Sequence, residues 1–247
     1  LKFGSDANFS SQNSFAALSR IQVLQGREFI NAEWGDNDTD SDGNDNPFAK
    51  IGSDPSLQET TDPSIQDPAL LNAFNSLSLT EMSDGEGDDK GNFKFRALFN
   101  KGLTDNDNGE DSVPELVFFE RGTNDQFEVQ AITGGTFGNP TLSDAVTLNS
   151  SNFWNSGVDV NTQEIGNSQE IGVGGIDLND LGLSNGETVY GFELTSLNGT
   201  GPDLNGMFLA TEDPSRFTSQ AVPEPTTMLG VLIAGGLGTY ASKKKKA

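Results

Sequence analysis

The chain has 247 residues and is strongly acidic: 37 Asp and Glu outnumber 14 Lys and Arg, which gives a net charge of −23. It contains no Cys and no His, so thiol nucleophiles, disulfides, the usual zinc sites and Ser-His-Asp triads are excluded. The charge also excludes nucleic acid as a partner, because affinity for phosphates depends on Lys and Arg. Divalent cations and cationic partners are favoured instead. The length fits one substantial domain, and 17 Phe can supply its core.

Residues 1–80 have a mixed apolar periodicity, and their clearest predicted element is a helix near residues 68–77. Asp67 suits the cap that precedes a helix, and Pro68 suits its first turn. The apolar side chains that follow recur at helical spacing, so we expect the helix to pack across one face of a sheet. These side chains are Leu70, Leu71, Phe74 and Leu77.

The strongest local motif is the stretch DNDTDSDGNDN, in which Asp38, Asp40 and Asp42 alternate before Gly43. Alternate carboxylates in a tight turn can converge on one hard cation, and the glycine allows the sharp bend that such a loop needs. The EF-hand pattern requires a bidentate Glu at the twelfth position, where this chain has Ala49, so we do not expect an EF-hand. Two interpretations remain: a calcium loop completed by other oxygen ligands, and an acidic loop exposed to solvent.

The pattern of residues 92–211 predicts a mostly β domain. The expected fold is an antiparallel, jelly-roll-like β-sandwich with one or two short helices. The segment NFKFRALF shows strict alternation, and so do FEVQAI and TVYGFELT, which indicates strands with one buried face. Turns rich in Gly, Asn and Asp separate the strands. The side chains expected to face the core include Phe93, Phe95, Ala97 and Phe99 of the first segment and Phe127, Val129 and Ala131 of the second.

A second acidic stretch, DNDNGED, joins two of these strands and contains Asp105, Asp107 and Asp111 around Gly109. A Ca²⁺ ion held by these carboxylates would close the loop, which is a role that disulfides fill in chains that contain cysteine. The alternative is again a loop that its own charge keeps extended. Ca²⁺ is therefore the one cofactor that the sequence predicts, with ligands in both acidic loops.

The C-terminal stretch VPEPTTMLGVLIAGGLGTYASKKKKA combines a proline-bracketed glutamate, an uncharged apolar run and four lysines. Residues 226–242 are uncharged and lie at the lower edge of the length that spans a bilayer. The lysines at 243–246 would stay cytoplasmic by the positive-inside rule, which places the acidic body outside. The alternative is a Gly-rich segment buried in the domain. The chain therefore divides into a domain over 1–219 and a tail over 220–247, and the tail includes an apolar helix.

The tail resembles the PEP-CTERM sorting signal in its motif, its apolar helix and its basic end, although that end is rich in lysine rather than arginine. The motif residues are Val222, Pro223, Glu224 and Pro225. The resemblance implies export, brief anchoring in the inner membrane, cleavage by an exosortase and delivery to the cell surface. The stretches FKFRALFNKGLTDNDNGEDSVPELVFFERG and TVYGFELTSLNGTGPDLNGMFLA also resemble cyanobacterial exosortase-dependent surface proteins. Members of such families are often linked to extracellular polysaccharide and biofilm matrix.

We interpret the protein as an exported structural or adhesive component of the cell surface or extracellular matrix, stabilised by calcium and not an enzyme. Its partners would be the exosortase, the membrane before cleavage and exopolysaccharide. Without His or Cys, catalysis would need a carboxylate pair or a metal-bound water, and 37 acidic residues bring some carboxylates together by chance. Two alternatives remain. One is a carbohydrate-binding module, for which Trp34 and Trp154 are the candidate aromatic platforms, and the other is an acidic subunit that self-associates through free sheet edges. Because most Trp residues are largely buried, we expect Trp154 to lie in the core instead.

Calcium is expected to raise the melting temperature of the domain, because a ligand that binds only the folded state stabilises it. Changing Asp105 and Asp107 to Asn should remove more of that gain than changing Asp84 and Asp88 in the weaker acidic stretch SDGEGDD, because only the former loop joins two predicted strands. Thermal unfolding in calcium and in chelator measures both effects. Identical melting in the two solutions would contradict the prediction.

Overall fold

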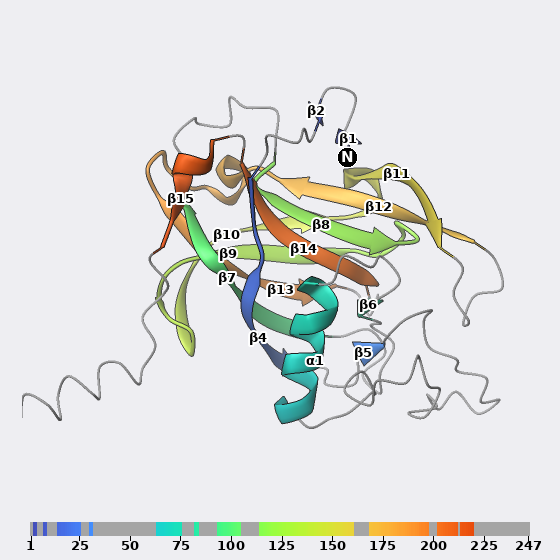
Figure 1. Ribbon diagram of the computed structural model, residues 1–247, viewed down its shortest axis with the longest axis horizontal. Coiled ribbons are helices and arrows are strands. Elements are labelled where there is room, and N and C mark those ends of the chain that lie inside the picture. The colour runs from blue at the N-terminus through green and yellow to red at the C-terminus, as the bar shows by residue number, and fades with distance from the viewer. Residues whose placement is uncertain are drawn as a thin grey trace, which may run out of the picture.

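The computed structural model describes residues 2–3, 7–8, 14–25, 30–31, 63–75, 82–83, 93–104, 114–160, 168–197, 202–211 and 213–219. Within these residues the chain is mostly β, with antiparallel sheets and one α-helix (Figure 1), which confirms the predicted fold class at this level. The elements in chain order are β1 (Lys2–Phe3), β2 (Ala7–Asn8), β3 (Ser14–Ala16), β4 (Leu18–Gln25), β5 (Ile30–Asn31), α1 (Pro63–Asn75), β6 (Met82–Ser83), β7 (Lys94–Thr104), β8 (Leu116–Arg121), β9 (Phe127–Thr136), β10 (Asn139–Leu148), β11 (Phe153–Val160), β12 (Gln169–Ile176), β13 (Thr188–Ser196), β14 (Leu204–Thr211) and β15 (Phe217–Thr218).

The larger sheet is organised around β7, which has neighbours on both sides. On one side the order is β10-β9-β13-β7. The other side is shared, because β4 pairs with residues 94–99 of β7 and β15 pairs with residues 102–103. The smaller sheet has the order β11-β12-β8-β14-β3. Two further pairs of very short strands, β1 with β2 and β5 with β6, lie outside both sheets.

The core lies between the two sheets, where alternating side chains of each sheet point inward. Phe118 of β8 contacts Phe192 of β13 across this space, with ring centroids 5.6 Å apart and planes at 87°. Burial of a side chain of this size stabilises the fold by about 1.5–3 kcal/mol, and an edge-to-face contact adds about 1 kcal/mol. Alternation along β9 and along β7, counted from the residue before β7, places the predicted residues in this core: Phe93, Phe95, Ala97, Phe99, Phe127, Val129 and Ala131 are all buried.

The chain passes from one sheet to the other at both lateral edges of the domain. Ala17 alone separates β3, in the smaller sheet, from β4, in the larger sheet. At the other edge the 3₁₀ turn Ser150–Asn152 separates β10 from β11. Asn149 caps this turn, because its side-chain oxygen accepts a hydrogen bond from the backbone N–H of Ser151 at 2.9 Å. The two crossings join the sheets covalently along their sides.

The boundaries of α1 differ from the helix that the sequence predicts. The helix begins at Pro63, where the fixed φ of proline suits a first helical residue, and it ends at Asn75. It therefore starts before the predicted segment near 68–77, and Pro68 lies inside it rather than in its first turn. Asp67 lies within the helix as well, so it is not the cap that the sequence suggests.

The helix lies beside β4, as Figure 1 shows, and it also contacts β14 of the smaller sheet. The prediction that it packs across one face of a sheet is therefore wrong, because the helix packs along the side of the domain next to an edge strand. The side chain of Asn75 accepts a hydrogen bond from the backbone N–H of Leu18 at 2.9 Å and donates one to its carbonyl at 2.8 Å. Asp67 accepts a hydrogen bond from the backbone N–H of Val23 at 3.0 Å. These side chains satisfy backbone groups that a neighbouring strand would otherwise satisfy. Phe74 is buried in the core and fixes the helix in this position.

At the other side of the larger sheet, β10 is an exposed but irregular edge strand. Pro140 has no backbone N–H, and the register between β10 and β9 shifts at two points between Thr141 and Ala145. Proline and irregularities of this kind hinder an edge strand from pairing with another chain. Because α1 covers β4, both of these strands are protected against edge pairing.

Replacing Asn75 by Ala should lower the free energy of unfolding by about 2 kcal/mol, because two hydrogen bonds to the edge of β4 are lost. Asn72 is exposed on the same helix, so Asn72→Ala is the matched control and should change stability by less than about 0.5 kcal/mol. Urea unfolding of the two variants makes the comparison. Equal stability of both variants would show that the helix is held by Phe74 and its apolar neighbours alone.

Candidate functional site

The residues that the sequence singles out as a metal site and a sorting motif all lie outside the described residues, so the structure neither assembles nor separates them. They are Asp38, Asp40, Asp42, Asp105, Asp107 and Asp111, and Val222, Pro223, Glu224 and Pro225. The predicted apolar helix over 226–242 lies outside them too. In the described ranges no helix has the length and apolar character needed to cross a bilayer. Nor do these ranges contain three or more Asp, Glu, His or Cys side chains grouped to hold a metal ion.

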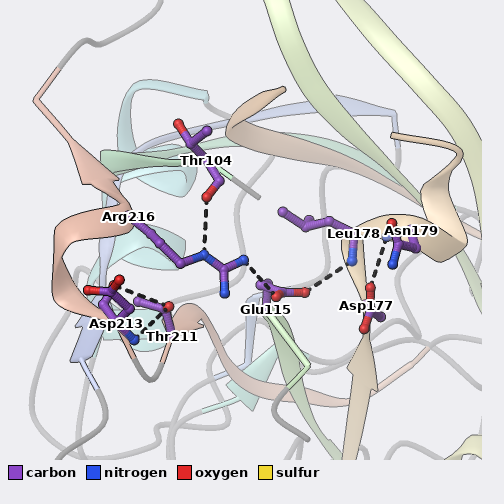
Figure 2. A network of polar contacts seen from close by, with 8 residues as sticks. All are labelled: Thr104, Glu115, Asp177, Leu178, Asn179, Thr211, Asp213 and Arg216. Carbon is purple, nitrogen blue, oxygen red and sulfur yellow. Dashed lines mark hydrogen bonds and ion pairs between the residues drawn. The ribbon is translucent and has the colours of Figure 1, made fainter. Parts of the chain in front are cut away.

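The structure does describe both ends of the second acidic stretch, and one arginine joins them. Thr104 ends β7 and Glu115 precedes β8, so the two residues flank positions 105–113. Arg216 donates a hydrogen bond from Nε to the carbonyl of Thr104 at 3.1 Å and from Nη2 to Oε1 of Glu115 at 3.0 Å (Figure 2). The side chains of Arg216 and Glu115 are only 5% and 1% exposed. Breaking a buried ion pair by removing one partner costs about 3–5 kcal/mol, so the contact is well placed to fix both ends.

Glu115 extends this polar network to the residues that follow the neighbouring strand β12, whose last residue Ile176 is paired with Leu116. Its second carboxylate oxygen accepts a hydrogen bond from the backbone N–H of Leu178 at 3.1 Å. Leu178 begins the 3₁₀ turn Leu178–Leu181, and Asp177 caps that turn by accepting from the backbone N–H of Asn179 at 2.9 Å. Figure 2 shows the continuous chain of contacts from Arg216 through Glu115 to this turn.

Arg216 itself is held by the 3₁₀ turn Pro214–Arg216, the last turn among the described residues. Asp213 caps the turn by accepting a hydrogen bond from the backbone N–H of Ser215 at 2.9 Å. The side-chain and backbone hydrogen bonds from Ser215 lower the pKa of Asp213. β15 follows directly and pairs with β7 at Leu103. We name the set Thr104, Glu115 and Arg216 the C-terminal clamp, because it ties the end of the domain to both flanks of the acidic stretch.

A second group of charged residues lies at one end of the smaller sheet, and sequence reasoning missed it. Glu120 is the last residue of β8 on the face that Leu116 and Phe118 turn toward the core, and it is 0% exposed. Burial first, and then repulsion by Asp203 and Asp125, raises the pKa of Glu120 to about 10, against the opposing effects of the Thr123 backbone and Arg121. Glu120 is therefore a neutral carboxylic acid in the folded domain near neutral pH.

The neighbours of Glu120 are themselves buried charges. Arg121 donates hydrogen bonds to Oδ2 of Asp203 from Nε at 3.0 Å and from Nη2 at 2.5 Å, and the Arg121 side chain is 0% exposed. Burial raises the pKa of Asp125 to about 6, while Arg121 lowers it. We name Glu120, Arg121, Asp125 and Asp203 the carboxyl cluster. Its signal in the sequence was the alternation of Leu116, Phe118 and Glu120, which predicts that the glutamate points inward with the two apolar residues.

The two tryptophans have different outcomes. Trp34 lies outside the described residues. Trp154 is half-buried on the outer face of β11, where it packs against a small apolar cluster that includes Val117, Phe119 and Val173. It is therefore a partly exposed residue outside the main core between the two sheets, whereas the sequence predicts a core position.

No protein-family model matches this chain, and no curated protein or solved structure shows a significant similarity to it.

Replacing Arg216 by Ala should lower the free energy of unfolding by about 3–5 kcal/mol, because Glu115 then remains buried without this counter-charge. The double variant Arg216→Met with Glu115→Gln should be closer to the native protein than Arg216→Ala is, since no uncompensated charge is buried. Chemical denaturation of both variants tests the clamp. A loss below about 1 kcal/mol for Arg216→Ala would contradict it.

Proposed function

We propose that the protein is an exported structural or adhesive component of the cell surface or extracellular matrix, delivered there by an exosortase-dependent sorting tail. The observation that carries this proposal is the order of features at the C-terminus. The Pro-Glu-Pro motif, an uncharged apolar run and four lysines follow one another, and residues 219–222 separate them from β15, the last described strand of the β domain. A folded domain that ends just before such a tail can be exported, held by the apolar helix and released by cleavage near Pro223–Pro225.

The position of the C-terminal clamp supports a role that bears mechanical load. While the tail anchors the protein, any pull on the domain is applied just after β15. At that point Arg216 is bonded to β7 through Thr104 and to Glu115 just before β8. Force is thereby shared between strands of both sheets rather than carried by the two residues of β15.

Calcium at the second acidic stretch would act on the same region. Thr104 and Glu115 flank Asp105, Asp107 and Asp111, and the clamp already brings these flanks together. A loop whose ends are fixed loses less conformational entropy when an ion binds it, which favours binding. We therefore propose this stretch, ahead of the one with Asp38, Asp40 and Asp42, as the principal calcium site.

A jelly-roll-like sandwich is the finer fold that we propose for the domain. Two features support this choice. The chain crosses between the two sheets repeatedly, for example from β7 to β8 and from β13 to β14, and the sheets share one apolar core. Sandwiches of this type display loops at their ends and flat faces between them, and both serve as contact surfaces in adhesive proteins.

Of the two alternative functions, carbohydrate binding has a specific observation in its favour. Trp154 is a half-buried residue that packs on an outer sheet face, a position that suits stacking against a sugar. Self-association through the larger sheet is disfavoured, because α1 satisfies the edge of β4 and irregular pairing with Pro140 protects β10. Self-association through β3 or β11, the edge strands of the smaller sheet, stays an alternative.

The sorting proposal predicts a shortened protein in the native envelope, because cleavage removes the apolar helix and the lysines. Intact mass and tryptic mapping of the recovered protein should place its C-terminus between Pro223 and Thr227. A variant with Pro223 and Pro225 changed to Ala is the matched control and should keep its tail. Recovery of the native protein with Lys243–Ala247 intact would overturn the exosortase proposal and leave a membrane-anchored protein.

A further inference from the structure

The carboxyl group of Glu120 is buried with little hydrogen bonding to support a negative charge. Neither of its oxygens has a hydrogen-bond partner of normal geometry among the residues that the structure describes, and the residue is 0% exposed. The backbone N–H of Thr123 favours the ionised form, but its effect is smaller than the effects of burial, Asp203 and Asp125. The residues opposite it on the neighbouring strands are Gly172 of β12 and Leu204 of β14, which bring no charge and no polar side chain. An ionised carboxylate in such surroundings is very unfavourable, so the group has to be neutralised.

The charged groups around Glu120 add to this demand. Asp125 acts on it from the turn that follows β8, and Asp203 acts on it from the residue before β14; both repel a negative charge. Arg121 attracts it, but the guanidinium is already bonded to Asp203. The carboxyl cluster thus contains three carboxyl groups and one guanidinium, and repulsion exceeds attraction at Glu120.

A proton or a metal ion can neutralise this carboxyl, and the geometry favours the proton. A calcium ion is typically bound by about six to eight oxygen ligands that surround it. Within the described residues no three carboxylate, His or Cys side chains are grouped to hold a metal. A proton needs only one carboxyl oxygen, and neither oxygen of Glu120 has a hydrogen-bond partner of normal geometry among the described residues.

The segment next to Glu120 is held in an unfavourable backbone conformation. Gly122 and Thr123 have φ values of 89° and 56°, and a β-branched residue rarely adopts a positive φ. The methyl group of Thr123 lies against Gly172, the residue opposite Glu120, where an added Cβ would collide with it. The turn therefore depends on close packing at the place where Glu120 is buried.

We propose that Glu120 acts as a proton-dependent latch. The folded domain keeps a proton on this carboxyl group. Release of the proton in alkaline solution loosens the end of the domain that is formed by residues 122–126 and Asp203. A negative charge at Glu120 draws water toward the carboxyl and repels Asp125 and Asp203, which opposes the packing of Thr123. The latch is independent of sorting, so it stands whether or not the tail is cleaved.

The sign of the pH dependence follows from the two raised pKa values. The pKa of Glu120 rises from 4.5 to about 10, and that of Asp125 rises from 3.8 to about 6. The stabilisation is complete below the unfolded values. As the pH rises, the part due to Asp125 is lost up to about 6 and the part due to Glu120 up to about 10. Between the unfolded and the folded pKa of each group, the folding equilibrium constant falls about tenfold per pH unit.

The test is denaturant unfolding of the full chain between about pH 6.5 and 9.5. In this range Asp125 is ionised in both the folded and the unfolded state, whereas Glu120 holds a proton only in the folded state, so Glu120 alone of these two groups contributes to the pH dependence. The native protein should lose about tenfold in folding equilibrium constant per pH unit, and Glu120→Gln should show no such slope, because glutamine keeps the shape and cannot ionise. Glu128→Gln, at a half-buried position of β9 in the other sheet, is the control and should keep the slope. A slope that persists in Glu120→Gln would overturn the latch.

A second measurement detects the proton itself and does not depend on stability. Infrared spectra at about pH 8 should contain the carbonyl stretch of a protonated carboxylic acid in the native protein and lack it in Glu120→Gln. Absence of this band from the native protein would overturn the proposal. So would its disappearance on addition of calcium, together with the loss of the slope, because the cluster would then be a cation site.

Discussion

The structure depends first on the packing of phenylalanine side chains between two antiparallel sheets. Phe118 on one sheet and Phe192 on the other meet at 5.6 Å, and Phe95, Phe99 and Phe127 extend the same layer. Successive side chains of a strand point to opposite faces of its sheet, so only every second side chain can enter this layer and be buried in it. The two sheet crossings, helix α1 and the C-terminal clamp all lie around this core and close its sides and ends.

Buried glutamates show how the domain handles its excess of negative charge. Glu115 is matched by Arg216, and Glu193 on β13 is matched by Arg96 and Lys94 on β7, with Nε of Arg96 3.0 Å from the carboxylate. Glu120 is not matched in this way and is neutral instead. The first two sites convert sequence-distant charges into contacts between strands, whereas the third makes stability sensitive to protons. A buried charge has to be paired or removed, and this chain uses both solutions.

The proposed surface function brings these features together around the ends of the domain. The C-terminal clamp lies where the proposed sorting tail leaves the domain and where the proposed calcium stretch begins and ends. Helix α1 and the irregular pairing of β10 protect the two edges of the larger sheet, so pairing between copies would have to use β3 or β11, the edge strands of the smaller sheet. The latch at Glu120 is at another end, formed by the turn after β8 and the segment before β14.

Local patterns in the sequence determined the β class, the inward faces of β7 and β9 and the existence of a helix, because period-two and helical spacing are properties of neighbouring residues. The order of motif, apolar run and lysines in the tail is likewise local, and the proposed function rests on it. Only the tertiary structure decided that α1 begins at Pro63 and that Asp67 bonds to Val23, 44 residues away. It also decided that Glu115 pairs with Arg216, 101 residues away, and that like charges surround Glu120. These outcomes depend on which strands become neighbours, and the spacing of residues along the chain does not contain that information.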